Sequence, residues 1–89
     1  MSVTRDVQIV NPLGLHARPA AQLVKLASKY TSDVTISRDG MPINAKSIMG
    51  VMMLAAEQGA TVSISAVGAD AEDAVNALAA LVAAGFGEM

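Results

Sequence analysis

The sequence predicts an α+β fold, a two-layer open-faced sandwich with a four-stranded, mainly antiparallel sheet and three helices on one face. Segments that alternate or are rich in β-branched residues are interleaved with segments of helical apolar spacing, in the order β-α-β-β-α-β-α. Hydrophobic residues make up 53% of the 89 residues, which argues against disorder. The chain has no cysteine, repeat or linker, so we expect residues 1–89 to form one domain stabilised by packing alone.

The first strand and the first helix flank a short apolar loop. Residues 3–10 alternate in part and end at the turn signal Asn11-Pro12. Residues 17–30 have helical spacing, and Pro19 fits the first turn because its missing N–H is not needed there. One helix face is apolar and the opposite face is basic: Ala20, Leu23, Val24, Ala27 and Tyr30 against Arg18, Lys25 and Lys29.

A hairpin comes next in the chain. Residues 34–37 are rich in β-branched side chains and predict a strand. The pair Asp39-Gly40 predicts a tight turn. Residues 41–45 would return as an edge strand, because Pro42 has no N–H to donate.

A short helix and a further strand follow the hairpin. The helix is expected to begin at Ser47, to extend to about Leu54 or Ala56, and to be ended by Gly59. Residues 61–66 alternate and predict the last strand.

The last helix has signals at both ends. Asp70 is expected to cap its N-terminus, with Glu72 and Asp73 in the first turn, where the helix dipole favours negative charge. Gly85 fits the C-terminal cap. The face expected to be buried comprises Ala74, Val75, Leu78, Leu81 and Val82.

Net charge and hydropathy argue against several classes of function. A formal charge of −2 and a pI near 5.0 do not suit a general binder of nucleic acid backbones. No apolar run approaches the roughly 18 residues that cross a bilayer. The polar N-terminus does not match a signal peptide, so we expect a cytoplasmic protein.

The charges are unevenly distributed along the chain. Residues 1–46 hold all six Lys and Arg residues with three acids, whereas residues 47–89 hold five acids and neither Lys nor Arg. This separation predicts a basic face that attracts an acidic partner, although a solvated helix face would give the same pattern.

His16 is the first candidate for chemistry, because it stands where the first helix begins. Free N–H groups and the helix dipole favour an anion there, and a neutral imidazole is a nucleophile near pH 7. Arg18 adds a permanent cation with a planar donor fork. His16 has no carboxylate nearby in the sequence for a catalytic triad and cannot bind a metal alone, so a transient covalent carrier without a cofactor fits best. The alternative is a helix cap or an ordinary surface residue.

The second candidate is an apolar surface on the short helix. On a helical wheel Val51 and Leu54 face one side, and the other side carries Ile48, Met49, Met52 and Met53. Only one side can be buried, so the second set, here called the Met-rich patch, is expected to be exposed and to bind partner proteins. The alternative is that the methionines fill an irregular core.

Ser47 has two expected roles. Its hydroxyl is suited to cap the short helix. A phosphate on it would be compatible with the helix dipole and would place a dianion beside the Met-rich patch. Such a modification would regulate docking while leaving the helix folded.

Two motifs resemble those of a known family. Residues 14–21 (Gly-Leu-His-Ala-Arg-Pro-Ala-Ala) resemble the active-site signature of HPr, the histidine-containing phosphocarrier of the bacterial phosphotransferase system. Residues 44–52 (Asn-Ala-Lys-Ser-Ile-Met-Gly-Val-Met) resemble its regulatory-serine segment. The likeness covers nearly the whole chain. Residues 81–86 are more similar to the nitrogen-related paralogue NPr, whereas the Ser47 segment resembles HPr of species that have the serine kinase.

The resemblance implies a role for each matching residue. His16 would accept a phosphoryl group on Nδ1 from enzyme I, with phosphoenolpyruvate as the source, and pass it to an EIIA-type acceptor. The Arg18 side chain and the backbone of Ala17 and Arg18 would hold the phosphate. Ser47 matches the site of the HPr kinase/phosphorylase. The positions that meet partners would be Ala17, Ala21, Lys25, Ile48, Met49 and Met52.

Two classes of function follow. A phosphocarrier is turned over by its partners, so it would be no enzyme in its own right, and we expect a monomer without a cofactor. The alternative is a regulatory docking module that binds a transcription regulator or a metabolic enzyme without phosphotransfer. His16 distinguishes them, because a purely regulatory protein needs no phosphorylatable residue at the helix start.

Overall fold

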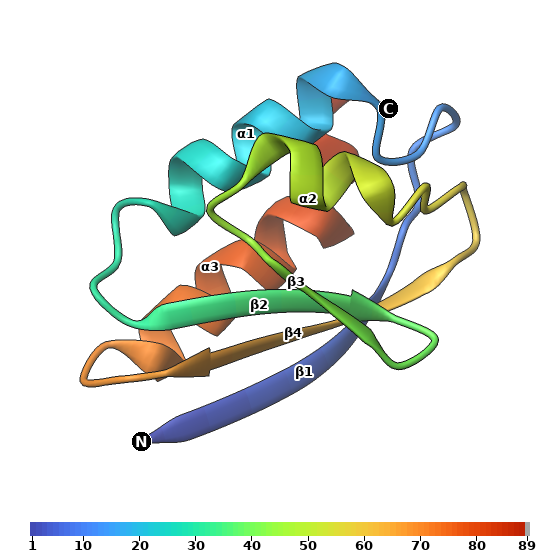
Figure 1. Ribbon diagram of the computed structural model, residues 1–89. Helices are drawn as coiled ribbons and strands as arrows, with labels where there is room; N and C mark the ends of the chain where they lie inside the picture. The colour runs from blue at the N-terminus through green and yellow to red at the C-terminus, as the bar shows by residue number, and fades with distance from the viewer. Residues whose placement is uncertain (89) are drawn as a thin grey trace.

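The computed structural model describes residues 1–88 and has the expected order of elements (Figure 1). The strands are β1 (Ser2–Gln8), β2 (Asp33–Arg38), β3 (Met41–Asn44) and β4 (Thr61–Val67). The helices are α1 (Ala17–Ala27), α2 (Ile48–Met53) and α3 (Ala71–Ala83), followed by a short 3₁₀ helix, η1 (Gly85–Gly87).

The four strands form one antiparallel sheet in the order β1-β4-β2-β3. The hairpin turn between β2 and β3 has φ values of 54° at Asp39 and 80° at Gly40, the left-handed pair that an Asp-Gly turn favours. β3 lies at an edge of the sheet, as Pro42 predicts. The helices lie together on one side of the sheet (Figure 1). The predicted sandwich is therefore confirmed.

The core lies between the sheet and the helices. Alternate residues of β2 and β4 point into it, and α3 covers them with the face that its spacing predicts. One predicted member of that face, Leu81, is only half-buried. The buried side chains from these three elements include Val34, Ile36, Val62, Ile64, Ala74, Val75, Leu78 and Val82.

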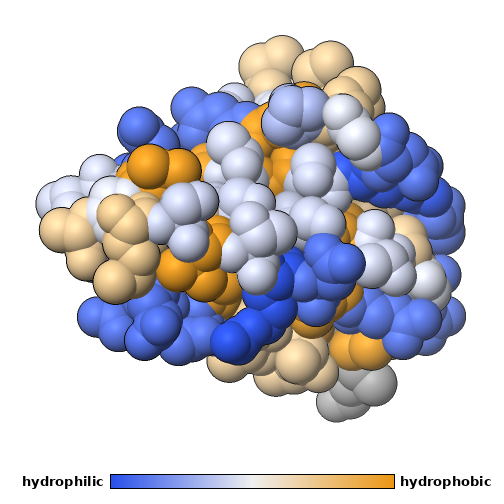
Figure 2. Space-filling model, turned by 90° about the horizontal axis from the view of Figure 1, so that it is seen from below, coloured by the Kyte–Doolittle hydropathy of each residue, from blue (hydrophilic) through white to orange (hydrophobic). Residues whose placement is uncertain are grey.

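The opposite face of the sheet is polar. Thr35, Ser37, Ser63 and Ser65 alternate with the buried residues and are partly exposed, and Ser65 Oγ lies 2.9 Å from Thr4 Oγ1 on β1. Figure 2 views the molecule from the side of the strands and shows mostly hydrophilic and neutral residues, with smaller hydrophobic areas between them. A large apolar docking surface therefore has to be sought on the helical side.

β1 is shorter than its apolar pattern predicts. It ends at Gln8 instead of Val10, because its partner β4 begins at Thr61. Beyond the strand, Ile9 N–H still donates to Ala60 O at 2.8 Å, in the turn that leads into β4. The other strand ends agree with prediction to within about a residue.

α1 is also shorter, ending at Ala27 instead of Tyr30. After the helix, Lys29 N–H donates to Leu26 O at 3.1 Å and Tyr30 N–H donates to Ala27 O at 3.2 Å. These bonds reach back three residues, so the last turn is tighter than an α-helix. Tyr30 nevertheless packs against the core, which explains why the apolar spacing continues past the helix.

α2 ends earlier than its sequence signals predict. Ser47 caps it as expected, but the last helical residue is Met53. The chain leaves the helix through Ala55, which adopts φ 48°. Gly59 lies in the turn before β4 and does not end the helix.

Asp70 occupies the N-cap position of α3 but forms no cap hydrogen bond with that helix. Its carboxylate instead accepts hydrogen bonds from the backbone N–H groups of Thr31 and Ser32, each at 2.9 Å, and from both of their hydroxyls. Asp70 is therefore the N-cap residue, as predicted, but its side chain binds the loop between α1 and β2 instead of the first turn of α3. At the other end of α3, Gly85 follows the cap with φ 65°, as predicted.

Within residues 1–88, no helix is both long enough and apolar enough to span a membrane.

Candidate functional site

A tight loop places His16 at the start of α1. Gly14 N–H donates to Asn11 O at 3.1 Å, and Leu15 N–H donates to Ala56 O at 2.9 Å. Gly14 adopts φ 65°, and a Cβ on it would collide with Ala56 O. The loop before His16 is therefore built directly against the segment that follows α2.

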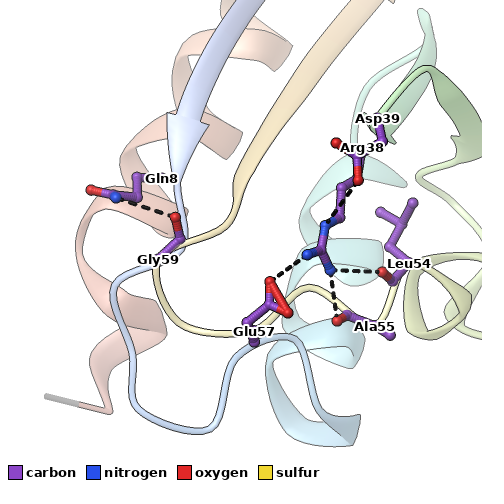
Figure 3. Close-up of polar contacts among 7 residues, drawn as sticks. All are labelled: Gln8, Arg38, Asp39, Leu54, Ala55, Glu57 and Gly59. Carbon is purple, nitrogen blue, oxygen red and sulfur yellow. Dashed lines mark hydrogen bonds and ion pairs between the residues drawn. The ribbon is translucent and has the colours of Figure 1, made fainter.

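Arg38, at the end of β2, holds that segment (Figure 3). Its Nη1 donates to Ala55 O at 2.9 Å and to Leu54 O at 3.4 Å, and its Nη2 pairs with the Glu57 carboxylate. The guanidinium thus satisfies carbonyl groups that the end of α2 leaves unpaired.

Two glutamine side chains join the segment after α2 to β1 and to the residues that follow β1. Gln8 Nε2 donates to Gly59 O at 3.3 Å (Figure 3). Gln58 Nε2 donates to Val10 O at 3.0 Å. The backbone that supports the His16 loop is therefore tied to both β1 and β2.

His16 is the N-cap residue of α1, yet its imidazole does not cap the helix. Its backbone is extended (φ −77°, ψ −172°), and its carbonyl accepts from Ala20 N–H at 3.0 Å. Pro19 has no N–H, so the N–H groups of Ala17 and Arg18 are those left open in the first turn. The helix-cap alternative for the imidazole is therefore wrong, and the first turn is open to an anion.

The end of the chain supplies the carboxylate that the local sequence lacks. Glu88 Oε1 lies 3.1 Å from His16 Nε2, although the two residues are 72 positions apart. The side chains are 35% exposed for His16 and 18% exposed for Glu88, so their contact is partly shielded from water. The carboxylate partner of His16 therefore comes from a distant part of the chain, since none lies nearby in the sequence.

A sharp bend after α3 brings Glu88 back to His16. Gly85 and Gly87 adopt φ 65° and 74°, and Phe86 between them adopts φ 56°. The Phe86 side chain is buried and belongs to the core, which anchors the bend. The position of Glu88 is therefore set by packing.

Asn11 connects Glu88 to the loop. Its Nδ2 donates to Gly14 O at 2.8 Å and to Glu88 Oε1 at 3.0 Å. Both partners are acceptors, which determines the orientation of the amide, even though its buried Oδ1 has no partner within residues 1–88. Asn11 is itself fully buried and so offers Glu88 a fixed donor.

The charge state of Glu88 determines the tautomer of His16. Burial raises the pKa of the Glu88 carboxyl, but hydrogen bonds from His16 and Asn11 and the charges of His16 and Arg18 outweigh burial and hold that pKa below its ordinary value. The group is therefore a carboxylate at neutral pH, which can only accept a hydrogen bond. Nε2 of His16 must then bear the hydrogen, which leaves the lone pair of the neutral imidazole on Nδ1.

The Met-rich patch is exposed as predicted. Val51 and Leu54 are buried, while the four residues of the patch are between 43% and 78% exposed. The alternative that the methionines fill the core is therefore wrong. On the adjacent helix α1, the predicted partner positions Ala17, Ala21 and Lys25 are also exposed.

Ser47 lies directly before the Met-rich patch. Its Oγ accepts a hydrogen bond from Gly50 N–H at 3.2 Å, which confirms the expected cap. The side chain is partly exposed. The residue therefore combines a structural role with access from solvent.

α1 and α2 pack together and run in opposite directions (Figure 1). Lys46 Nζ, before α2, donates to Tyr30 O, after α1, at 2.8 Å. At the other end, Ala56 O, after α2, accepts from Leu15 N–H, before α1, at 2.9 Å.

This arrangement separates the two predicted phosphorylation sites. Ser47 and His16 lie at opposite ends of the helix pair, at a distance of about 16 Å along α1 if each residue rises about 1.5 Å. The structure thus gathers His16, Arg18 and Glu88 at one end and leaves Ser47 at the other. Within residues 1–88 it forms no cluster of three or more His, Asp or Glu side chains that could hold a metal.

Sequence reasoning missed Asn11 and Glu88 as members of the site. Asn11 precedes proline, which signals a turn but not a buried amide. Glu88 has no local signal at all, because its contact with His16 depends on the path of the whole chain.

Comparisons with known proteins agree with this geometry. A family model described as the PTS HPr component phosphorylation site matches residues 3–84. The chain is 54% identical over 84 residues to the phosphocarrier protein HPr of Cupriavidus necator, which covers 94% of each chain.

Solved structures give the same result. HPr-C-His from Thermoanaerobacter tengcongensis has a TM-score of 0.94 and 46% identity, with 98% of both chains covered. A phosphocarrier protein HPr from Bacillus anthracis has a TM-score of 0.87 and 47% identity, covering 91% of this chain and 96% of that one. The chain therefore belongs to the HPr family, the phosphocarrier proteins of the phosphotransferase system, which carry a phosphoryl group and are not themselves enzymes.

Proposed function

We propose that this protein accepts a phosphoryl group on Nδ1 of His16 from enzyme I, with phosphoenolpyruvate as the source. It would pass the group to an EIIA-type acceptor in sugar uptake or in the nitrogen-related branch. One observation carries this proposal: the Glu88 carboxylate contacts Nε2, which leaves the imidazole lone pair on Nδ1 at the residue that begins α1.

The transfer forms one bond and breaks one. The lone pair of Nδ1 attacks phosphorus, and the bond from phosphorus to the donor breaks, with its electron pair leaving on the donor. The N–H groups of Ala17 and Arg18, the helix dipole and the Arg18 guanidinium stabilise the charge on the phosphoryl oxygens. In the onward step the acceptor attacks phosphorus and the imidazole leaves.

Partner proteins would bind the exposed surface of α1 and α2 around His16. Several observations support this assignment. The Met-rich patch is exposed and adaptable, and the charged residues of α1 are all basic, which favours an acidic partner. The expected contact residues are Ala17, Ala21, Lys25, Ile48, Met49 and Met52.

Ser47 would be phosphorylated by the HPr kinase/phosphorylase, and the phosphate would weaken docking of enzyme I. Ser47 directly precedes Ile48 and Met49, which are 44% and 78% exposed. A dianion at this position must lose water when the patch docks, and it repels an acidic partner. The same phosphorylated face would be available to a transcription regulator.

Labelling with enzyme I and phosphoenolpyruvate tests the proposal. His16 is the single histidine of the chain, so the wild type should gain one acid-labile phosphoryl group and His16→Ala should gain none. Ser47→Ala is the matched control and should label like the wild type, because Ser47 lies at the other end of the helix pair. A known HPr confirms that the enzyme I is active.

Two results would contradict the proposal. One is a His16→Ala protein that still takes the label. The other is a wild-type protein that takes none while the known HPr is labelled, which would instead favour the regulatory docking module.

A further inference from the structure

Glu88 contacts the ring nitrogen that does not take the phosphoryl group. Its Oε1 is 3.1 Å from His16 Nε2 and 3.0 Å from Asn11 Nδ2. The contact is built into the fold, because Asn11 is fully buried and the buried Phe86 anchors the bend before Glu88. A loose chain end would make no such pair of bonds.

We propose that Glu88 is a positioning residue with two effects on His16: it directs phosphorylation to Nδ1, and it keeps a proton on Nε2 while the phosphoryl group is bound. This inference rests on the proposed function of His16. Its consequence is that the imidazole leaves more readily in the onward transfer.

The first effect follows from which nitrogen of the His16 ring carries the hydrogen. Nε2 keeps its hydrogen and donates a hydrogen bond to the carboxylate, so it has no free lone pair with which to attack phosphorus. The carboxylate also repels an approaching anionic donor from that side of the ring. Nδ1 keeps its lone pair and is the nucleophile.

The second effect follows from the proton balance of the reaction. A neutral imidazole with hydrogen on Nε2 becomes cationic when Nδ1 bonds to phosphorus. If that hydrogen stays, the N–P electron pair returns to Nδ1 in the next step and a neutral imidazole leaves. If the hydrogen has been lost to solvent, the leaving group is an imidazolate anion, which is far less stable.

Glu88 is well placed to retain this proton. A carboxylate accepting from a cationic N–H makes a charge-assisted hydrogen bond, which is stronger than a neutral one. The positive charge of Arg18, which acts on Glu88, disfavours a cationic ring, but Arg18 pairs with the phosphoryl oxygens in the proposed reaction. Glu57, whose backbone lies against Gly14 of the loop, has its carboxylate paired with Arg38.

The tautomer can be tested on the unphosphorylated protein by ¹⁵N NMR of His16. In the wild type the neutral ring should have its hydrogen on Nε2. In Glu88→Gln the amide can donate as well as accept, so the form with hydrogen on Nδ1 should gain population. Glu72→Gln removes the same charge from the first turn of α3, at the opposite end of that helix, and should leave the tautomer unchanged.

The retained proton can be tested after chemical phosphorylation with phosphoramidate, which requires no partner protein. ¹⁵N and ³¹P NMR then identify the phosphorylated nitrogen and follow loss of the Nε2 proton as the pH rises. In Glu88→Gln that loss should occur at a pH lower by roughly half a unit, the size expected for a partly exposed ion pair. Glu72→Gln should titrate like the wild type. Thermal melts confirm that both variants are folded.

The results separate this inference from the proposed function. An unchanged tautomer and an unchanged titration in folded Glu88→Gln would overturn the role of Glu88, even if enzyme I labels the wild type normally. An equal shift in Glu72→Gln would also overturn it, because the effect would then come from net charge. Failure of enzyme I to label the wild type would contradict the proposed function and would leave these NMR results standing.

Discussion

At the scale of single residues, His16 depends on neighbours that act in different ways. Glu88 occupies one ring nitrogen, and Asn11 holds Glu88 in place. Gly14 lets the loop approach Ala56 closely enough for a backbone hydrogen bond. A carrier needs one lone pair and a place for an anion, so this small set is sufficient without a catalytic triad.

Arg18 has a role that can be measured separately from folding. Its side chain is exposed, so Arg18→Ala should keep the melting temperature of the wild type. The rate of phosphotransfer to and from His16 should fall on the order of 10²-fold, because one donor to the developing phosphoryl charge is lost. Single-turnover transfer from phosphorylated enzyme I gives this rate.

Lys29→Ala is the matched control for Arg18. It removes a positive charge just beyond the other end of α1, so it tests whether charge alone matters. A transfer rate in Arg18→Ala equal to that of the wild type in both directions would remove Arg18 from the mechanism. Equal losses in the two variants would assign the effect to steering of the partner.

At the scale of elements, polar side chains join helix ends to distant loops. Arg38 joins the end of α2 to β2, and Lys46 joins the start of α2 to the end of α1. Asp70 joins the start of α3 to the loop after α1. These hydrogen bonds fix the relative positions of the short elements in a small domain that has no disulfide.

Asp70 makes the stability of this junction depend on pH. The Ser32 hydroxyl and the Thr31 N–H, with further hydrogen bonds from the same two residues, lower the pKa of Asp70 from 3.8 to about 2. Because the folded-state pKa is the lower one, the carboxylate stabilises the fold above about pH 4, and this contribution is lost as the pH falls toward 2. Asp70→Asn should therefore be less stable than the wild type at pH 7, and the difference should shrink between pH 4 and pH 2.

Chemical denaturation at a series of pH values measures this difference. Asp73→Asn, in the first turn of α3, controls for the charge at the helix start because Asp73 is exposed and, within residues 1–88, has no hydrogen bond to the loop after α1. The assignment fails if wild type and Asp70→Asn lose stability in parallel from pH 4 to pH 2.

At the scale of the whole molecule, the two sides of the sandwich have different surfaces. The open face of the sheet is polar (Figure 2), whereas the helical side has the Met-rich patch next to the basic residues of α1. His16 and Ser47 lie at opposite ends of this side, separated by roughly the length of α1, which is about 16 Å if each residue rises about 1.5 Å. Direct repulsion between phosphates at the two sites is therefore weak, since salt screens charges over about 8–10 Å.

A charge at Ser47 should act mainly on docking. Aspartate is as good an N-cap as serine, so Ser47→Asp should melt at or slightly above the wild-type temperature, with a gain of roughly 0.3–1 kcal/mol. Labelling of His16 should need more enzyme I, and this effect should shrink with added salt because repulsion of an acidic partner is screened. The measurement is the dependence of His16 labelling on enzyme I concentration at low and high salt.

Asn76→Asp is the matched control for Ser47→Asp. It adds the same charge to an exposed position of α3, away from α2. If both variants lose affinity equally, net charge explains the effect. If Ser47→Asp labels like the wild type at every concentration of enzyme I, Ser47 is a helix cap only.

The sequence by itself determined the order of elements, the faces they bury and the candidate nucleophile. These features depend on residues close together in the chain. Apolar spacing identified Val51 and Leu54 as the buried side of α2. The pair Asp39-Gly40 identified the hairpin. Pro19, three residues after His16, identified the start of the helix. The proteins that bind an exposed surface such as the Met-rich patch are harder to predict, because the spacing of apolar residues shows only which side of the helix is exposed.

The tertiary structure alone decided which distant polar groups meet. Glu88 contacts His16, which is 72 positions away in the chain. The side chain of Asp70, at the start of α3, binds the loop at Ser32. Helix and strand preferences act over a few residues, whereas these contacts depend on how the packed elements route the chain. The partly buried carboxylates of Glu88 and Asp70 pair with the donors that packing brings near, because a polar group withdrawn from water without a partner is costly.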